Sequence, residues 1–245
     1  MENQGTILAL LTALIPLPPF IAFGLILLFA NRRKRLSHTL AIGSVAVSFA
    51  LSQVVFWNAL QIEDLGKYPI AARIPWLPVG DRPLEFGVLV DPLGAVTLFM
   101  VPLVSLMIFI YSVGYMAGDP DYSRFFALLS LFEAAMLLLV VADNLLMLFI
   151  GWEVMGFCSY ALIGFWYRKP SAYRAAVKAF MTTRVGDVLM LLGIAYLYAQ
   201  TGTLNFHDIL RNPETLKALA ETPSYVVGLS VAALASLLLF AGTVG

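Results

Sequence analysis

Four ionisable residues lie inside long apolar runs of the sequence, where a charge is costly. They are Glu133, Glu153, Arg184 and Asp187. A charged side chain at the centre of a bilayer costs about 2.5–3.5 kcal/mol on insertion scales. Membrane proteins carry such residues where they serve an ion path or pair with an opposite charge. The four residues therefore predict either a route for protons or a buried structural ion pair.

Glu153 is the first candidate for proton transfer. It follows Asn144 by nine residues, so at about 1.5 Å per residue it lies about 13 Å deep, near the midplane. Gly151, Gly156 and Gly164 allow other helices to approach this stretch closely. Because burial disfavours a charged carboxylate, its protonation depends on a nearby cation. This favours a proton relay; the alternative is a neutral side chain that hydrogen-bonds across a helix interface.

Arg184 and Asp187 are three residues apart, so they share one helix face and can pair. The pair either locks helix packing or provides the cation that keeps Glu153 or Glu133 ionised.

Glu133 and Lys178 are weaker candidates for a place on the same route. Glu133 follows Arg124 by nine residues, again near mid-depth. It is either a proton site or a packing acid, that is, a hydrogen-bonded carboxyl group that only supports helix packing. Lys178 lies near the start of the helix that holds Arg184. It either extends its charge to the membrane surface or belongs to an access path.

The composition places these residues in a membrane protein. Hydrophobic residues make up 60% of the chain and charged residues 12%, which is outside the range of soluble domains. The apolar runs reach about 20 residues, enough to cross about 30 Å of hydrocarbon as a helix. The formal net charge is zero, so nothing indicates a nucleic-acid partner. The single cysteine, Cys158, excludes an internal disulfide and a cysteine-ligated iron–sulfur cluster within this chain.

We expect an all-α polytopic membrane protein of about seven transmembrane helices, truncated from a larger bundle. The expected helices cover 7–30, 39–60, 92–116, 124–141, 145–167, 173–198 and 225–245. Asp91-Pro92 is a favourable helix start, and Pro102 should kink the helix that follows. The first apolar run has no basic residue before it and is long, which favours a retained helix over a signal peptide.

Two connections should carry structure of their own. In the segment 61–90, Leu84, Phe86, Val88 and Val90 alternate with other residues and Gly80-Asp81 offers a turn, so a short extramembrane β-hairpin is expected. In the segment 200–224, Asn212-Pro213-Glu214 predicts the start of a short surface helix.

Basic residues in the loops predict the orientation. Nine lie on one side: Arg32, Arg33, Lys34, Arg35, Arg124, Arg168, Lys169, Arg174 and Lys178. Five lie on the other: Lys67, Arg73, Arg82, Arg211 and Lys217. The first side should be cytoplasmic, or the equivalent matrix or stromal side. We expect the bacterial cytoplasmic (inner) membrane, with the N-terminus and the hairpin facing outward.

Several long strings resemble one family of membrane proteins. They are YSVGYMAGDPDYSRFF, VVADN, GWEVMGFCSYALIGFWYRKP, KAF and TTRVGDVLMLLG. Together they resemble the antiporter-like subunit L (chain 5 type) of proton-pumping NADH:quinone oxidoreductase, respiratory complex I. The match is continuous over 111–202, whereas the first two helices match only in pattern.

The resemblance implies residues 1–116 as an N-terminal unit and 124–245 as the start of a proton-translocating repeat. It implies that the glutamate of the family's WE pair is Glu153, and that the RVGD string supplies Arg184 and Asp187. The family's next key residue is a lysine directly after a string like GTVG, and the sequence stops at that string. Thr183 stands where the family has Asn, and Glu133 where it has an apolar residue, which would be an added proton site.

The function that follows is proton translocation driven by quinone reduction in partner subunits. The resemblance implies no cofactor in this chain, with NADH, FMN, iron–sulfur clusters and quinone in its partners. The expected partners are other antiporter-like membrane subunits and the lipid bilayer, and the only small substrate is the proton. The alternatives are a subunit of a multi-subunit cation/proton antiporter, a membrane-bound hydrogenase or carbon-uptake subunit of the same superfamily, and a structural membrane subunit that moves no ion.

Overall fold

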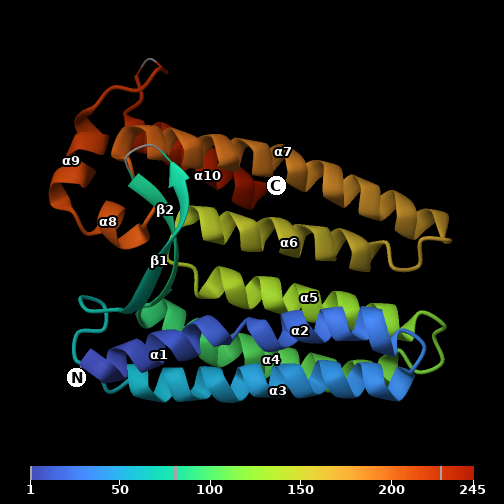
Figure 1. The fold of residues 1–245 in the computed structure, drawn as a ribbon. Coiled ribbons are helices and arrows are strands. Elements are labelled where there is room, and N and C mark those ends of the chain that lie inside the picture. Colours follow the sequence, from blue (N-terminus) through green and yellow to red (C-terminus); the bar gives the residue numbers. More distant parts are fainter. Residues whose placement is uncertain (1, 80–81, 227) are drawn as a thin grey trace.

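The computed structural model describes residues 2–79, 82–226 and 228–245. Long helices lie side by side, and a two-stranded hairpin crosses one end of the bundle (Figure 1). The helices are α1 (Glu2–Leu14), α2 (Leu17–Leu25), the π-helical segment η1 (Ile26–Ala30), α3 (Lys34–Ala59), α4 (Pro92–Tyr115), α5 (Tyr122–Val140), α6 (Leu145–Ile163), α7 (Pro170–Thr201), α8 (Phe206–Leu210), α9 (Pro213–Glu221) and α10 (Val231–Val244). The strands are β1 (Ile70–Val79) and β2 (Arg82–Val90).

Within the described residues, six helical stretches are long and apolar enough to cross a membrane. The first combines α1, α2 and η1 over Gly5–Ala30, and the others are α3 to α7. A seventh apolar helix, α10, is shorter, with 14 residues. The structure therefore confirms a mostly helical, multi-pass membrane fold with about the expected number of helices.

The first span is broken where its prolines lie. Pro19 has no N–H to donate to the carbonyl of Ile15 four residues earlier, and α1 ends at Leu14. The hydroxyl of Ser48 on α3 donates to that carbonyl at 2.7 Å. A neighbouring helix therefore satisfies the freed carbonyl group.

The predicted start of α4 at Asp91-Pro92 is confirmed, and α6 begins with a similar side-chain cap. The carboxylate of Asp91 accepts from the backbone N–H of Gly94 at 2.7 Å, and the amide oxygen of Asn144 accepts from that of Met147 at 2.9 Å. Each satisfies a free N–H of the first turn. These caps fix where α4 and α6 begin, and so fix the depth of the residues they carry.

The expected start of the last helix near Tyr225 is wrong. α10 begins at Val231, after a turn in which Pro223 and Ser230 pair as a β-bridge. Gly228 takes a φ of +85° in that turn, a conformation that glycine adopts at little cost. The connection after α7 holds the predicted surface helix, α9, and also α8, which the sequence pattern does not indicate.

The hairpin is longer than expected and has a third neighbour. β1 and β2 pair antiparallel, with Ile70 opposite Val90 and Ile74 opposite Phe86. The turn between α5 and α6 adds along the free edge of β2, since Val88 and Ala142 form a bridge and the N–H of Leu89 donates to the carbonyl of Val141 at 2.9 Å. The predicted Gly80-Asp81 turn lies outside the described residues.

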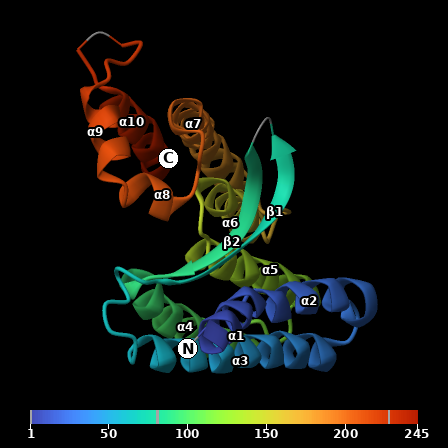
Figure 2. The same ribbon diagram turned by 60° about the vertical axis from the view of Figure 1, so that its left-hand side comes forward.

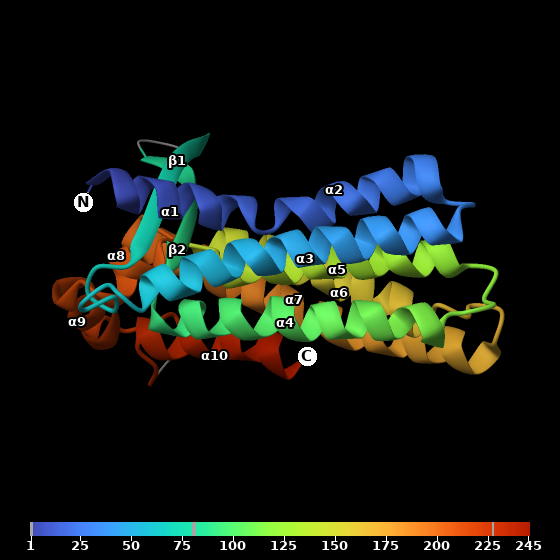
Figure 3. The same ribbon diagram turned by 90° about the horizontal axis from the view of Figure 1, so that it is seen from below.

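The bundle places its basic loops and its hairpin at opposite ends. The connections before α3, between α4 and α5, and between α6 and α7 lie together at one end (Figure 3). The hairpin, α8 and α9 lie at the other end, beside the N-terminus (Figures 1 and 3). The two groups of basic residues counted in the sequence are therefore separated by the full length of the helices.

Helix α5 packs on α2 and α3, and α6 lies between α5 and α7 (Figure 2). Helix α10 packs on α7. Glycines allow α6 to lie close to α5 and to α7. A Cβ on Gly151 of α6 would lie 3.0 Å from the carbonyl oxygen of Ala135 on α5, and one on Gly164 would lie 2.9 Å from Ala176 of α7. Close approach at both glycines is expected from the sequence, and the structure shows it.

Candidate functional site

The interface between α6 and α7 brings three of the predicted site residues together. Glu153 is near the middle of the 19 residues of α6, and Arg184 and Asp187 are near the middle of the 32 residues of α7. The guanidinium of Arg184 forms an ion pair with Glu153, and its Nη1 lies 3.6 Å from Oδ2 of Asp187. One cation is therefore shared by two carboxylates at mid-depth.

Burial differs between the two carboxylates. The side chain of Asp187 is 5% exposed, whereas those of Glu153 and Arg184 are each 28% exposed in this chain. Asp187 is thus fixed within the interface, and the Glu153–Arg184 pair lies at its border, where a further group can approach.

Trp152 is a partner of this site that the sequence analysis did not identify. Its indole N–H donates to Oδ1 of Asp187 at 2.8 Å. Adjacent helical residues point about 100° apart, and here both Trp152 and Glu153 reach groups on α7. The sequence shows that Trp152 is adjacent to Glu153, but it does not show that the indole N–H has an acceptor on another helix.

Aromatic packing on α7 holds the cation in place. The guanidinium carbon of Arg184 lies 4.6 Å from the ring centroid of Phe180, a cation–π distance. Phe180 in turn packs on Tyr160 of α6, with ring centroids 4.9 Å apart. Nε of Arg184 is buried without a hydrogen-bond partner among the described residues, so its donor capacity is not exhausted.

The end of α10 lies against α7 at the level of the shared cation. A Cβ on Gly186 would lie 2.8 Å from the carbonyl oxygen of Ala241 and 3.1 Å from Cα of Gly245. Gly186 stands between Arg184 and Asp187 in the sequence. The chain directly after α10 is therefore beside the charged site.

Glu133 lies elsewhere, between α4 and α5. Its side chain is 3% exposed, and the hydroxyl of Ser105 donates to its Oε2 at 2.5 Å. Oε1 is buried without a hydrogen-bond partner among the described residues. Ala135, which meets α6, is two residues further on, so Glu133 points about 160° away from that contact. It is a separate buried acid, distinct from the α6–α7 site.

Lys178 is not brought to the site. It is exposed on α7, six residues before Arg184 and about 9 Å from it along the helix axis. The backbone carbonyl of Lys178 accepts a hydrogen bond from the hydroxyl of Thr182. This placement is compatible with both interpretations of Lys178, a charge that extends to the surface and a residue on an access path.

Two stretches of the chain match described families. Residues 142–243 match the family described as "NADH:quinone oxidoreductase/Mrp antiporter, TM". Residues 76–126 match the family described as "NADH-Ubiquinone oxidoreductase (complex I), chain 5 N-terminus". The first match covers the whole α6–α7 site, and the second covers most of the hairpin together with α4.

Curated relatives carry names of one kind. The chain is 40% identical over 214 residues to the NAD(P)H-quinone oxidoreductase chain 5 of Synechocystis sp., which covers 87% of this chain and 30% of that protein. It is 42% identical over 197 residues to the NADH-quinone oxidoreductase subunit L of Mycobacterium tuberculosis, covering 80% of this chain and 31% of that protein. It therefore spans about 30% of the length of these relatives.

Solved structures share the fold. The Mrp complex from Dietzia sp. matches with a TM-score of 0.74 at 23% identity, over 94% of this chain and 23% of that chain. The membrane-bound sulfane sulfur reductase, an archaeal respiratory membrane complex, matches with a TM-score of 0.73 at 18% identity, over 94% and 43%. At these identities the likeness concerns the fold alone. The sequence matches go further, and the chain belongs to the antiporter-like subunit L (chain 5) family of NADH:quinone oxidoreductase.

Proposed function

We propose that the full-length protein translocates protons as a membrane subunit of an NADH:quinone oxidoreductase. Quinone reduction in partner subunits would drive the transfer. The observation that carries the proposal is the cation of Arg184 shared between Glu153 and Asp187 in the middle of two membrane-spanning helices. A buried group that changes its charge when one side chain moves is what proton transfer across a membrane requires.

Arg184 acts as the switch in this proposal. While its guanidinium pairs with Glu153, the carboxylate is held charged, because a nearby cation favours the ionised form. Movement of the guanidinium toward Asp187, which its Nη1 already approaches to 3.6 Å, leaves Glu153 without that cation. Glu153 then takes up a proton, and the return of Arg184 releases it.

A second cation in the full-length protein would complete the relay. The resemblance implies a lysine directly after the string Gly242–Gly245. Gly245 lies against Gly186 of α7, so a lysine that follows it would lie at about the depth of the Glu153–Arg184 pair. The lysine would then compete with Arg184 for Glu153 and pass the proton onward.

The other candidate residues take lesser parts. Glu133 would be a second proton-binding group, held between α4 and α5 by Ser105. Lys178 would lie on an access path from the basic end of the bundle. Residues 1–116 would form the N-terminal unit, and 124–245 would begin the proton-translocating repeat.

The chain would act without a redox centre of its own. NADH, FMN, the iron–sulfur clusters and quinone would bind to partner subunits, and the direct neighbours would be other antiporter-like membrane subunits. The protein would lie in the bacterial cytoplasmic (inner) membrane with its N-terminus and hairpin facing outward, since the end that carries nine basic residues should be cytoplasmic.

A subunit of a multi-subunit cation/proton antiporter is the second candidate. The fold likeness to the Mrp complex favours it. The sequence favours the first candidate, since identity to the quinone oxidoreductase relatives is about 40%, against 23% for the Mrp complex. Sodium-dependent exchange without a redox partner would support the antiporter.

The test is Glu153→Gln in the full-length protein, assembled with its partner subunits in membrane vesicles. The amide keeps the size of the side chain but can no longer exchange a proton. We expect NADH oxidation to continue while pumping falls at least about tenfold, which corresponds to about 1.4 kcal/mol in a barrier. The control is Glu221→Gln on α9, where the exposed carboxylate pairs with Lys217 at 3.9 Å. Normal pumping by an assembled Glu153→Gln enzyme would overturn the proposal.

A further inference from the structure

A polar cavity opens at the hairpin end of the α6–α7 interface. Its volume is about 390 Å³, room for on the order of ten water molecules. Its walls include Asn144 and Leu146 at the start of α6, Tyr198 and Thr201 at the end of α7, and Thr215 of α9. The cavity therefore lies between the same two helices that hold Glu153 and Arg184.

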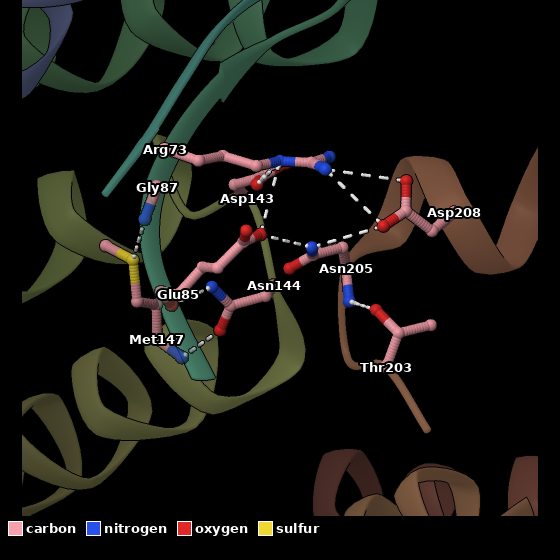
Figure 4. Close-up of polar contacts among 9 residues, drawn as sticks. All are labelled: Arg73, Glu85, Gly87, Asp143, Asn144, Met147, Thr203, Asn205 and Asp208. Carbon is pink, nitrogen blue, oxygen red and sulfur yellow. Dashed lines mark hydrogen bonds and ion pairs between the residues drawn. The ribbon is translucent and has the colours of Figure 1, made fainter. Parts of the chain in front are cut away.

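A charged cluster forms one side of this cavity (Figure 4). Arg73 of β1 donates to the buried Asp143 at 2.5 Å and 3.3 Å, and its guanidinium lies 3.4 Å from Asp208 of α8 and 4.0 Å from Glu85 of β2. The amide of Asn205 donates to Glu85 at 2.7 Å and to Asp208 at 3.2 Å. These three carboxylates and one arginine carry a net charge of −2 if all are ionised.

Backbone hydrogen bonds join the segments that form the cavity wall. The N–H of Leu145 donates to the carbonyl of Leu204 at 3.0 Å, and the N–H of Phe206 donates to that of Asp143 at 3.0 Å. Asn144 also donates from its side chain to the carbonyl of Glu85 at 2.9 Å. The hairpin, the α5–α6 turn and the segment before α8 are thus tied together, and the polar side chains around the opening are held in place.

The cavity ends a short distance from the charged site. Leu146 in its wall is six residues, or about 9 Å along the helix, from Trp152, which binds Asp187. On α7 the interval from Tyr198 to Asp187 is eleven residues, or about 16 Å. This interval carries the apolar residues Met190, Ile194 and Leu197, which belong to one buried cluster. An apolar layer therefore separates the cavity from the charged site.

We propose that this cavity is the aqueous port on the hairpin side through which the α6–α7 site exchanges protons, with Glu85 and Asp208 at its mouth. This inference rests on the proposed function. The excess of carboxylates raises the local concentration of cations, protons included, and both side chains reach solvent, being 33% and 43% exposed. Arg73 lies near both carboxylates, and the amide of Asn205 donates to both. The proton crosses the apolar layer only when water enters it.

Cysteine labelling tests the port. In the full-length protein, Cys158 and any other cysteines are replaced, and Thr201→Cys is introduced in the cavity wall. A membrane-impermeant, anionic methanethiosulfonate reagent is then added from the hairpin side. Leu210→Cys on α8, which is 61% exposed, is the control outside the cavity, and Val188→Cys, on the apolar surface of α7 and 59% exposed, is the control within the span.

We expect the reagent to modify Thr201→Cys within about tenfold of the rate at Leu210→Cys, and to leave Val188→Cys unmodified. Modification at 201 should lower pumping at least about tenfold, whereas modification at 210 should not. Failure to label position 201 would show that the cavity is not aqueous, and labelling without loss of pumping would show that it is not the port. Either result overturns the inference.

Thr215→Cys on the opposite wall serves if Thr201→Cys does not fold, because its labelling reports on the same cavity. The outcome is distinct from a failure of the proposed function. If Glu153→Gln pumps normally, the proton site is wrong whatever the labelling shows. If Glu153→Gln abolishes pumping but the cavity does not label, the site stands and only the port is wrong.

Discussion

The indole of Trp152 on α6 donates a hydrogen bond across the helix interface to the buried carboxylate of Asp187 on α7, at 2.8 Å. Trp166 makes a similar bond to Asp119 at 3.0 Å, but in an exposed loop. The two bonds join the same pair of residue types at different burial. Because donor and acceptor types are the same, a difference in their contributions to stability reflects the difference in burial.

Replacing Trp152 by Phe should therefore lower the free energy of unfolding by about 1.5–3 kcal/mol, the range for a hydrogen bond to a charged group whose loss leaves a buried acceptor unsatisfied. Trp166→Phe should cost less, under about 1 kcal/mol, since water replaces the lost donor. Denaturant unfolding in detergent micelles measures both. Equal costs for the two variants would contradict the role given to burial of Asp187.

The ion pair of Arg184 with Glu153 should show coupling in a double-mutant cycle. Arg184→Ala alone leaves Glu153 without its cation and should destabilise the protein. Adding Glu153→Gln should recover part of the loss, giving a coupling energy of about 0.5–3 kcal/mol. The lower part of that range is expected, because both side chains are 28% exposed. Additive effects would show that the pair is not formed in the assembled protein.

Glu133 offers a prediction that separates a proton site from a packing acid. Oε1 of Glu133 has no hydrogen-bond partner among the described residues. Replacing Glu133 and Ser105 together by apolar residues removes the buried carboxyl and its half-buried donor at once. The double variant Glu133→Leu with Ser105→Ala should be neutral or stabilising, whereas Ser105→Ala alone should cost about 1–3 kcal/mol. If pumping by the double variant is normal, Glu133 is a packing acid. A fall in pumping without loss of stability would make it a proton site.

The Arg73–Asp143 contact should make stability depend on pH. Burial raises the pKa of the Asp143 carboxyl above its ordinary value, and the hydrogen bond and charge of Arg73 oppose that shift. An acid with a raised folded pKa stabilises the fold below its unfolded pKa of about 3.9. That stability is lost as the pH rises through the folded pKa. Removing Arg73 should raise the pKa further and widen this window.

Arg73→Ala should thus destabilise the protein at neutral pH by about 3–5 kcal/mol, the cost of leaving a buried charge unpaired. Lowering the pH from neutral into the acid range should restore part of the loss, because the raised pKa lets Asp143 take up a proton at a higher pH than an ordinary carboxyl. The double variant with Asp143→Asn is the control and should lack the recovery. Thermal unfolding between these pH values provides the measurement. A loss that stays constant across the range would contradict the burial of a charged Asp143.

The sequence predicted the spans well because their signal is local. Apolar runs bounded by caps such as Asp91 and Asn144 fix a helix within its own residues. The start of α10 was missed for a related reason. Tyr225 and Val226 are apolar and extend the run, but Gly228 turns the chain before the helix begins at Val231.

The polar contacts between distant segments could not be predicted from spacing. Glu153, Arg184 and Asp187 were found because a charge inside an apolar run is conspicuous. Trp152 and Ser105 belong naturally in such runs, so nothing in the pattern marks them as hydrogen-bond donors. Arg73 and Asp208 lie in polar segments, where a charge is ordinary, and 135 residues separate them along the chain. Only the folded hairpin and α8 bring them together.

Gly186 sets how far the last helix lies from the shared cation. With no side chain at this position, α10 touches the backbone of α7 between the two charged residues, and a single methyl group would meet the carbonyl oxygen of Ala241 at 2.8 Å. In the proposed relay, the distance between α7 and the lysine expected after Gly245 therefore depends on the absence of a side chain at position 186. An alanine here would keep every charge but move the end of α10 away from α7, so the proposed proton transfer should slow while the chemistry of each group stays unchanged.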